Sequence, residues 1–433
     1  MIVTDSVSVF AEGTFEEQIQ ELVEYATRGR PDDERASVLQ SFKNIVGAEG
    51  DEKPVEIDTN HRQSALKLVL DNTKGVGEGT EQEIEGFFNL LFSHLLTLWP
   101  DPSPEIRQHV ASLLSVLSVS PSEQSSIKYR VLSNLFNATP RTSALRPPIY
   151  TTLLELAISN NQLDVVSFSK PDIERWLKEW SVSDEEKSQF LKFIVDILVQ
   201  SGRPYVCHSF FCFLSLIHRL CEREKAYEYR LLYVQSLPLS SELRQSAAVD
   251  AIAAALRQPT VFDFEPLCKL EAVIAAKDHE LFPLLQIFLN SGYPELTTWA
   301  DNNIAVLDTY DLNRSELERK IRLLAFSSLA FDYIGRDLSY SQIASTLQVS
   351  SSEVEKWSID VIRAGLVSGK LSQATQTLHV FRSSARKFER EQWEALEKRL
   401  LSWKTGLASI IEIVANAQRW GSAGDIAEAI KGE

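Results

Sequence analysis

Hydrophobic positions recur with the 3.6-residue period of helices from about residue 14 to residue 335. Short polar or proline-bearing breaks separate the runs. Clear examples of the predicted helices are Phe15–Thr27, His61–Asn72, Ile84–Leu98, Pro104–Leu117, Ser122–Phe136, Ile149–Ser159, Asp184–Gln200, Tyr205–Arg223, Ser241–Arg257 and Glu280–Asn290. Stacked helix pairs are the natural way to bury many one-sided apolar stripes. Because no fixed period relates the runs, we expect a degenerate solenoid.

Two stretches interrupt this pattern with glycine and charge. Val46–Thr59 contains GAEGDEKP, and Lys74–Thr80 reads KGVGEGT. Both are predicted to be flexible surface links. The glycine spacing in the second faintly resembles a phosphate loop, but the Lys-Ser/Thr pair of such loops is missing downstream and Glu78 stands where an anion would approach.

The sequence pattern changes after about Asp311, where short predicted elements replace the long helical runs. Ser339 precedes an apolar run and has Gln342 three residues later, and Ser350 stands in the same relation to Glu353. Both pairs read as capping boxes, which begin helices. Two short helices are therefore predicted here.

The second of these helices leads into a predicted hairpin. Its inward stripe consists of Val354, Trp357, Val361, Ile362 and Leu366. Gly369 is expected to break the helix, and two short strand-like runs follow, Lys370–Ala374 and Thr377–Phe381. Three helices followed by a β-hairpin make a winged helix.

The predicted fold class is mostly α: a helical-repeat array, a C-terminal winged helix and a long final helix. The expected domains are an acidic helical segment over 1–60, the array over 61–310, the winged helix over 311–385, and a heptad helix with its tail over 386–433. Length supports this division, because 433 residues suffice for two or three domains.

A winged helix is most often a nucleic-acid reader, so the charge of its second helix matters. Ser352–Leu366 carries three acidic residues against two basic ones. An acidic helix in a groove lined by phosphates has a large electrostatic cost, and DNA reading is disfavoured. Between residues 368 and 405 the local charge is +4, with Lys370, Arg382, Arg386, Lys387, Arg390, Lys398, Arg399 and Lys404 against four glutamates. Contact of these basic residues with RNA remains an alternative. A helix face exposed to solvent, or one that binds an acidic protein partner, is favoured.

The whole chain is acidic, with a formal charge of −16. Residues 1–60 alone hold fourteen Asp and Glu against five Lys and Arg. Such a charge repels a phosphate backbone at long range, so protein partners are the better expectation.

No cofactor, metal ion or catalytic group is expected. In the one Cys/His cluster, CHSFFCFLSLIHRLC, eleven helical residues place Cys207 about 16 Å from His218, too far for one zinc ion. No sequence pattern of a nucleophile with its base or of a catalytic metal site is evident. We therefore expect a protein that is not an enzyme.

The chain shows neither a secretory signal nor a run of about 20 apolar residues that could cross a bilayer. The four cysteines are too few for a disulfide framework. A cytoplasmic protein without membrane contact is expected.

The final helix carries the sharpest interaction signal. An apolar seam with spacings of 3, 4, 3, 4, 3 and 4 residues runs along it, formed by Trp393, Leu396, Leu400, Trp403, Leu407, Ile410 and Val414. This spacing keeps one face apolar over three heptads. The seam is expected to pack either on its own domain or in a bundle with helices of neighbouring subunits.

The C-terminal part resembles a known family. KIRLLAFSSLA (320–330), LSYSQIASTLQVSSSEVEKWSIDVIRAGLVSGKLSQ (338–373) and TLHVFRSSARKFEREQWEALEKRLLSWKTGL (377–407) are similar to the PCI domain. That domain is shared by the proteasome lid, the COP9 signalosome and eukaryotic translation initiation factor 3. The resemblance is strong over about a hundred residues and loose over the array before them.

The resemblance implies a scaffold subunit of initiation factor 3 whose partners are other PCI and related subunits. It also implies binding to the small ribosomal subunit through the complex. The edge of the wing would pair with a neighbouring PCI subunit through Lys370, Leu371, Thr377, His379 and Phe381. The tail helix would join a bundle of several subunits. A COP9 signalosome or proteasome-lid subunit, or an RNA-contacting PCI protein of the messenger-export type, is the alternative.

Overall fold

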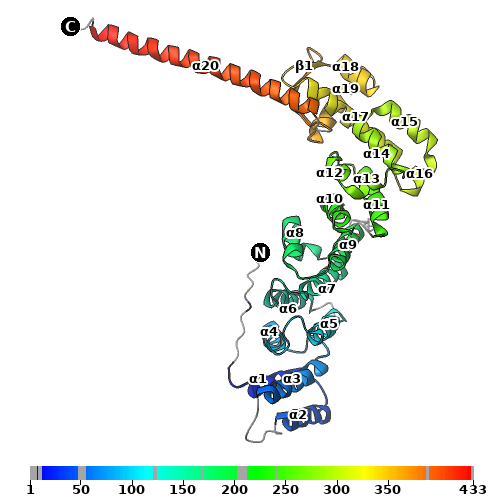
Figure 1. The fold of residues 1–433 in the computed structure, drawn as a ribbon, viewed down its shortest axis with the longest axis vertical. Helices are drawn as coiled ribbons and strands as arrows, with labels where there is room; N and C mark the ends of the chain where they lie inside the picture. Colours follow the sequence, from blue (N-terminus) through cyan, green and yellow to red (C-terminus); the bar gives the residue numbers. More distant parts are fainter. Residues whose placement is uncertain are drawn as a thin grey trace. The chain divides into compact units, whose positions relative to one another are not determined.

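The computed structural model describes Val7 and residues 12–46, 55–119, 124–160, 162–166, 169–201, 212–238, 241–386 and 390–430. The chain divides into two compact units, Met1–Ser241 and Glu242–Glu433. The described secondary structure is mostly helical, with one small sheet in the second unit (Figure 1). The predicted fold class is confirmed.

The first unit is a succession of helices. They are α1 (Phe15–Ala26), α2 (Asp32–Val46), α3 (Val55–Asn72), α4 (Glu81–Leu98), α5 (Pro104–Val119), α6 (Ser125–Ala138), α7 (Arg146–Ser159), the 3-10 turn η2 (Leu163–Val165), α8 (Lys170–Glu179), α9 (Asp184–Ser201) and α10 (Cys212–Ser236). Helices near in sequence pack together: α1 on α3, α4 on α6, α6 on α7, α7 on α9 and α9 on α10. This is the expected stacking of one-sided stripes.

The glycine-rich stretch Lys74–Thr80 is a packed turn rather than a flexible link. Val76 is buried, and its carbonyl accepts a hydrogen bond from the Tyr25 hydroxyl at 3.3 Å. Gly77 has φ +86°, and a Cβ there would lie 2.8 Å from the Tyr25 ring. Glycine is required because this turn combines a left-handed conformation with close ring contact. In the other predicted link, Val55–Thr59 belongs to α3, and residues 47–54 lie outside the described part.

The second unit begins with short helices and continues into the winged helix. The helices are α11 (Leu243–Arg257), α12 (Glu265–Cys268), α13 (Glu271–Ala275), α14 (Leu281–Asn290), α15 (Tyr293–Asn302), α16 (Ile304–Thr309) and α17 (Arg314–Asp332). Because α11 to α17 share a unit with the winged helix, the compact units divide at Ser241/Glu242, not at the expected 310/311 boundary.

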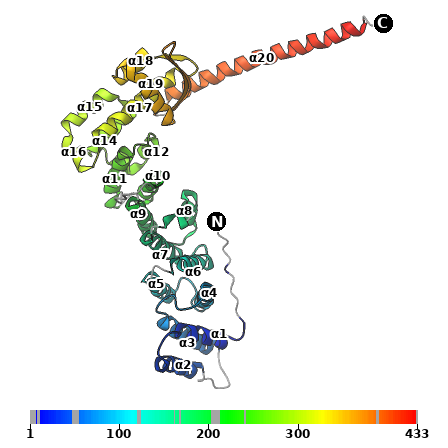
Figure 2. The ribbon, with the colours of Figure 1, turned by 180° about the vertical axis from the view of Figure 1, so that it is seen from behind.

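The winged helix follows α17. It consists of β1 (Asp337–Ser339), α18 (Tyr340–Leu347), the 3-10 turn η3 (Ser351–Glu353), α19 (Val354–Arg363), β2 (Val367–Ser372) and β3 (Thr377–Ser383). Ser339 with Gln342 and Ser350 with Glu353 form the two predicted capping boxes. The long helix α20 (Arg390–Ile430) comes last and is drawn in orange to red in Figures 1 and 2.

Gly369 does not end the second helix. That helix ends at Arg363, and Gly365, with φ +72°, turns the chain after it. Gly369 lies inside β2, where a Cβ would meet the His379 carbonyl oxygen at 2.5 Å. It is therefore needed for the close approach of two strands.

Candidate partner-binding surfaces

The winged helix has a core of its own. Buried side chains come from α17, α18, α19 and all three strands, including Phe326, Ile343, Val361, Leu378 and Val380. The predicted stripe of α19 faces this core: Val354 and Val361 are fully buried, and Trp357 and Ile362 pack partly against it. Burial of about a dozen such side chains, each contributing roughly 1.5–3 kcal/mol, stabilises the module.

The sheet of the winged helix has three strands in the order β1-β3-β2. The sequence analysis missed β1, a three-residue strand too short to show alternation. Because β3 is the central strand, the prediction that Thr377, His379 and Phe381 form a free edge is wrong. The outer strands are β1 and β2, so only Lys370 and Leu371 of the predicted edge residues lie at an edge.

The outer face of the sheet gathers polar and aromatic side chains. Nδ1 of His379 and Oδ1 of Asp337 lie 2.7 Å apart, and Lys370 stands opposite His379 on β2. A bulge pairs Ser368 with Arg382 and Gly369 with Val380, so Phe381 has no opposite residue in β2. Bulges re-aim side chains, and Phe381 is 58% exposed with its ring 5.3 Å from that of His379.

Leu371 belongs to the opposite face. It pairs with Leu378, which is fully buried, and packs partly against the winged-helix core. Directly opposite residues of an antiparallel pair share a face. The Leu371 side chain is thus part of the core, and only its backbone lies at the edge.

Helix α19 is held to α17 by an ion pair. Arg319 Nη2 lies 3.4 Å from Asp360 Oδ2, and both groups are partly exposed. Glu353 uses its carboxylate in the capping box at Ser350. These contacts give a structural role to two of the three acidic residues of Ser352–Leu366, Glu353 in η3 and Asp360 in α19.

Most of the predicted seam of α20 is exposed. Leu400 is 53% exposed and Trp403 is 68% exposed, and Leu407, Ile410 and Val414 are also open. Trp393 is exposed too, whereas Leu396 is partly covered. In this chain by itself, most of the seam does not pack on its own domain.

Sequence analysis missed further apolar side chains on α20. Leu401, Ile411 and Ile413 lie outside the seam and are each more than half exposed. At 100° per residue Ile411 lies along the margin of the seam, whereas Leu401 and Ile413 fall on other sides of the helix. From Leu400 to Val414 the helix is therefore apolar on more than one side, which is typical of a helix buried among several neighbours.

The beginning of α20 is attached to α17 through Arg399. Its Nη2 donates a hydrogen bond to the Phe331 carbonyl at 2.8 Å, and its guanidinium lies 5.0 Å from the Phe331 ring centroid. Arg386 is also turned inward and donates to the Ser291 carbonyl. Arg386 and Arg399, two of the cations counted between 368 and 405, thus donate to backbone carbonyls of the chain itself.

Lys320, the first residue of the KIRLLAFSSLA run, joins α17 to the end of α11. Its ammonium donates to the carbonyls of Ala255 at 2.6 Å and Gln258 at 2.8 Å. It also lies 4.9 Å from the Phe264 ring centroid. Burial lowers the pKa of Lys320 to about 7. A buried amine that serves the orphan carbonyls of a helix end fixes how the two helices meet.

Within the described residues, no group of three or more His, Cys, Asp or Glu side chains is arranged to hold a metal ion. Cys207 lies outside them, and α10 begins at Cys212. None of the helices in the described ranges is both long and apolar enough to span a membrane.

Comparison with known proteins agrees with this architecture. The PCI domain family model matches residues 299–382, which run from α15 into the last strand of the sheet. A second model, described as the eIF3 subunit M, C-terminal helix, matches residues 386–414. Residues 299–382 of the chain are thus similar to the PCI domain. The second match falls on the part of α20 that carries the exposed seam.

Full-length relatives extend the likeness beyond the PCI domain. Eukaryotic translation initiation factor 3 subunit M of Phaeosphaeria nodorum is 28% identical over 95% of this chain and 90% of its own. The same subunit of Emericella nidulans is 29% identical over 94% of this chain and 89% of its own length. That of Dictyostelium discoideum is 28% identical over 78% of this chain and 80% of its own length. These relatives confirm the resemblance to initiation factor 3 stated from the sequence motifs, and among its subunits the similarity is to subunit M.

Proposed function

We propose that this chain is a non-catalytic scaffold subunit of eukaryotic translation initiation factor 3. The observation that carries the proposal is α20, an exposed helix with apolar side chains on several sides, which begins beside a PCI winged helix and matches the subunit M C-terminal helix model. Such a helix is stable in water only when partners cover it. Its partners would be other PCI and related subunits of the factor.

The seam of α20 is the first proposed partner-binding surface. Its residues are Trp393, Leu396, Leu400, Trp403, Leu407, Ile410 and Val414. The exposure of most of these side chains supports packing against another chain rather than against its own domain. The two tryptophans would supply the large apolar area that dominates such contacts.

The wing is the second proposed surface, in a form revised from the sequence analysis. The backbone of β2, at Lys370 and Leu371, offers an edge to which a neighbouring PCI subunit adds. Thr377, His379 and Phe381 would contact the same neighbour through side chains on the outer face. The exposure of Phe381 supports this role.

The complex, in turn, would bring the chain to the small ribosomal subunit in the cytoplasm. Direct contact with RNA is not favoured, because the acidic residues of α19 remain and Arg386 and Arg399 are engaged within the chain. The winged helix therefore acts in assembly and not as a nucleic-acid reader.

Native purification from the source cell, followed by mass-spectrometric identification of stoichiometric partners, tests the proposal. We expect the other subunits of initiation factor 3. Subunits of the COP9 signalosome or the proteasome lid in stoichiometric amounts would overturn it. Titration of the full chain with single- and double-stranded RNA tests the RNA alternative, for which tight binding with a steep salt dependence would be the signature.

A further inference from the structure

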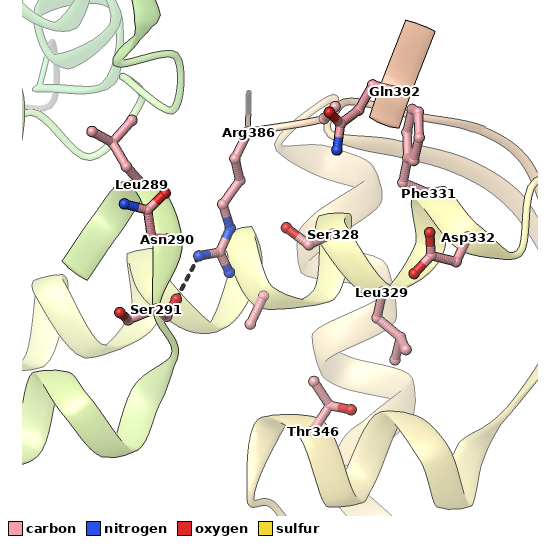
Figure 3. Close-up of a pocket in the computed structure, with 12 residues that line it drawn as sticks. Leu289, Asn290, Ser291, Ser328, Leu329, Phe331, Asp332, Thr346, Arg386 and Gln392 are labelled. Atoms are coloured by element: carbon pink, nitrogen blue, oxygen red, sulfur yellow. Dashed lines mark hydrogen bonds between the residues drawn. The ribbon is translucent and has the colours of Figure 1, made fainter. Parts of the chain in front are cut away.

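A polar cavity lies at the root of α20. It has a volume of about 640 Å³ and opens between the end of α14, the helix α17 and the residues Ala385 and Arg386 after β3 (Figure 3). Its lining includes Ser291, Leu329, Thr346, Arg386 and Gln392. The cavity lies wholly within the second unit, directly before the exposed part of the seam.

The Arg386 side chain reaches into this cavity, as Figure 3 shows. Its Nη1 donates to the Ser291 carbonyl at 2.6 Å, while its Nε is buried and has no hydrogen-bond acceptor. Among the described residues no carboxylate forms an ion pair with it. Burial lowers the pKa of Arg386 to about 10, which still leaves the guanidinium charged at neutral pH.

Arg386 is partly buried, and a cation whose buried Nε has no acceptor and which is served by one carbonyl oxygen is incompletely compensated. An arginine carries five N–H donors in a planar fork, and a carboxylate fits two of them at once. Removal of a guanidinium from water is costly unless an opposite charge replaces the lost hydration. The cavity therefore has the volume, the donors and the charge to receive an acidic group.

The other charge at the cavity decides which acidic group fits. Asp332 also lines it, on the α17 side. A phosphate group carries a charge of nearly −2 and would be repelled by this carboxylate more strongly than a singly charged carboxylate would. The lining thus favours an Asp or Glu side chain over a phosphate.

The position of the cavity identifies the source of that side chain. Gln392, in the first turn of α20, lines the cavity, and Trp393 next to it begins the seam. A chain that covers the exposed seam passes the mouth of the cavity. Charge complementarity at one end and apolar contact along the rest would together fix the register of such a chain.

We propose that the Arg386 cavity receives an Asp or Glu side chain of the partner subunit whose helix covers the α20 seam. The inference deepens the proposed function and rests on it. Arg386 would act as the register-setting contact, and the seam would supply the apolar area. Arg386 would thus serve protein assembly and not RNA binding, although it is one of the eight cations between residues 368 and 405.

Zero-length cross-linking tests the proposal directly. In the R386K variant, a carbodiimide joins the introduced amine to a carboxylate that touches it, and mass spectrometry of the purified complex identifies the linked residue. We expect an amide bond to an Asp or Glu of another subunit. A link to this chain's own carboxylates, or no link in an intact complex, would overturn the proposal.

Subunit exchange gives an independent measurement. The R386M variant keeps an unbranched apolar stem and removes the guanidinium with its charge, and we expect it to dissociate from the complex about 30-fold faster or more. R390M is the matched control, because Arg390 lies on the same segment with its side chain 91% exposed, and it should change the rate less than twofold. Equal rates for both variants would overturn the proposal.

Two further results separate the possible failures. Thermal unfolding of the isolated chain shows whether R386M folds; if it does not, the R386K cross-link alone decides. Stabilisation of the isolated wild-type chain by inorganic phosphate, with normal retention of R386M in the complex, would mean a free anion site and overturn the inference. Failure of the proposed function itself would appear differently, as a wild-type chain that does not co-purify with initiation factor 3 subunits.

Discussion

The winged helix and α20 carry the same kind of sequence signal with opposite structural outcomes. Both show apolar residues at helical spacing, but the stripe of α19 is covered by α17, α18 and β2, whereas α20 leaves most of its seam in water. The difference lies in what surrounds each helix. Amphipathic spacing predicts that the apolar face of a helix must be covered, but it does not predict which chain covers it.

The winged helix and α20 therefore differ in how each is stabilised. The winged helix completes its own core, so the surfaces it offers to other chains include an outer sheet face and the edge of the outer strand β2. The helix α20 has no core of its own, so its stability in the assembled state depends on other chains. The strongest tests therefore compare substitutions in the two regions.

The largest effect is expected from the seam. Replacement of Leu400, Trp403 and Leu407 together by Asp should weaken retention in the complex by about 100-fold or more, because three charges would be buried in an apolar contact. Quantitative co-purification measures it. The matched control places Asp at Lys398, Ser402 and Thr405 on the opposite side of the helix, where a much smaller loss is expected. Unchanged retention of the seam variant would break the assignment of the seam to a partner.

A pair of identical substitutions tests the contrast within the isolated chain. L378A removes a fully buried side chain of the winged-helix core and should lower the free energy of unfolding of that unit by about 2–5 kcal/mol. L407A removes a side chain that is 44% exposed and should change it by less than about 0.5 kcal/mol. Denaturant titration measures both. A large effect of L407A would show that the seam packs on its own chain.

Loss of the Lys320 amine should be the next largest effect. K320M keeps most of the side-chain volume but leaves the carbonyls of Ala255 and Gln258 without this donor, at a cost of about 1–3 kcal/mol. K356M, at an exposed position of α19, is the control and should be nearly neutral. Thermal unfolding of both variants checks the expectation, and equal melting temperatures would contradict it.

The outer sheet face should matter for assembly and not for folding. F381A should reduce retention in the complex by about 5- to 10-fold, with a change in unfolding free energy below about 0.5 kcal/mol. I359A, at an exposed apolar position on α19, serves as the control for a general loss of surface area. Retention equal to that of the control would remove Phe381 from the partner surface.

The smallest expected effect is a dependence of the stability of the first unit on pH. Burial lowers the pKa values of His94 and His109, both of which pack against aromatic rings. Below pH 6.5 the unfolded chain therefore binds protons that the folded unit resists, so stability should fall with falling pH. Denaturant titrations from pH 7.5 to 5 measure this slope, and it should be shallower in H94L. A slope unchanged by H94L would contradict the role of His94.

Local patterns determined much of the architecture. The helical array, the two capping boxes at Ser339 and Ser350, and the seam of α20 were all predicted from spacing alone, because cap hydrogen bonds and apolar periodicity depend on nearby residues. The PCI resemblance was visible for the same reason, since its motifs are contiguous runs. For α20, the sequence also showed that the seam must be covered.

Only the tertiary structure decided features that depend on distant partners. Strand β1 pairs with a segment about forty residues later in the chain, and this pairing makes β3 central and leaves β1 and β2 as the outer strands. Lys320 and Arg386 look like surface cations in the sequence, but the ends of helices α11 and α14 bring carbonyl groups to them, so that Lys320 is buried and Arg386 is partly buried. Periodicity determines which side of an element is apolar, whereas burial and charge compensation depend on which elements meet, and that is settled by packing over the whole unit.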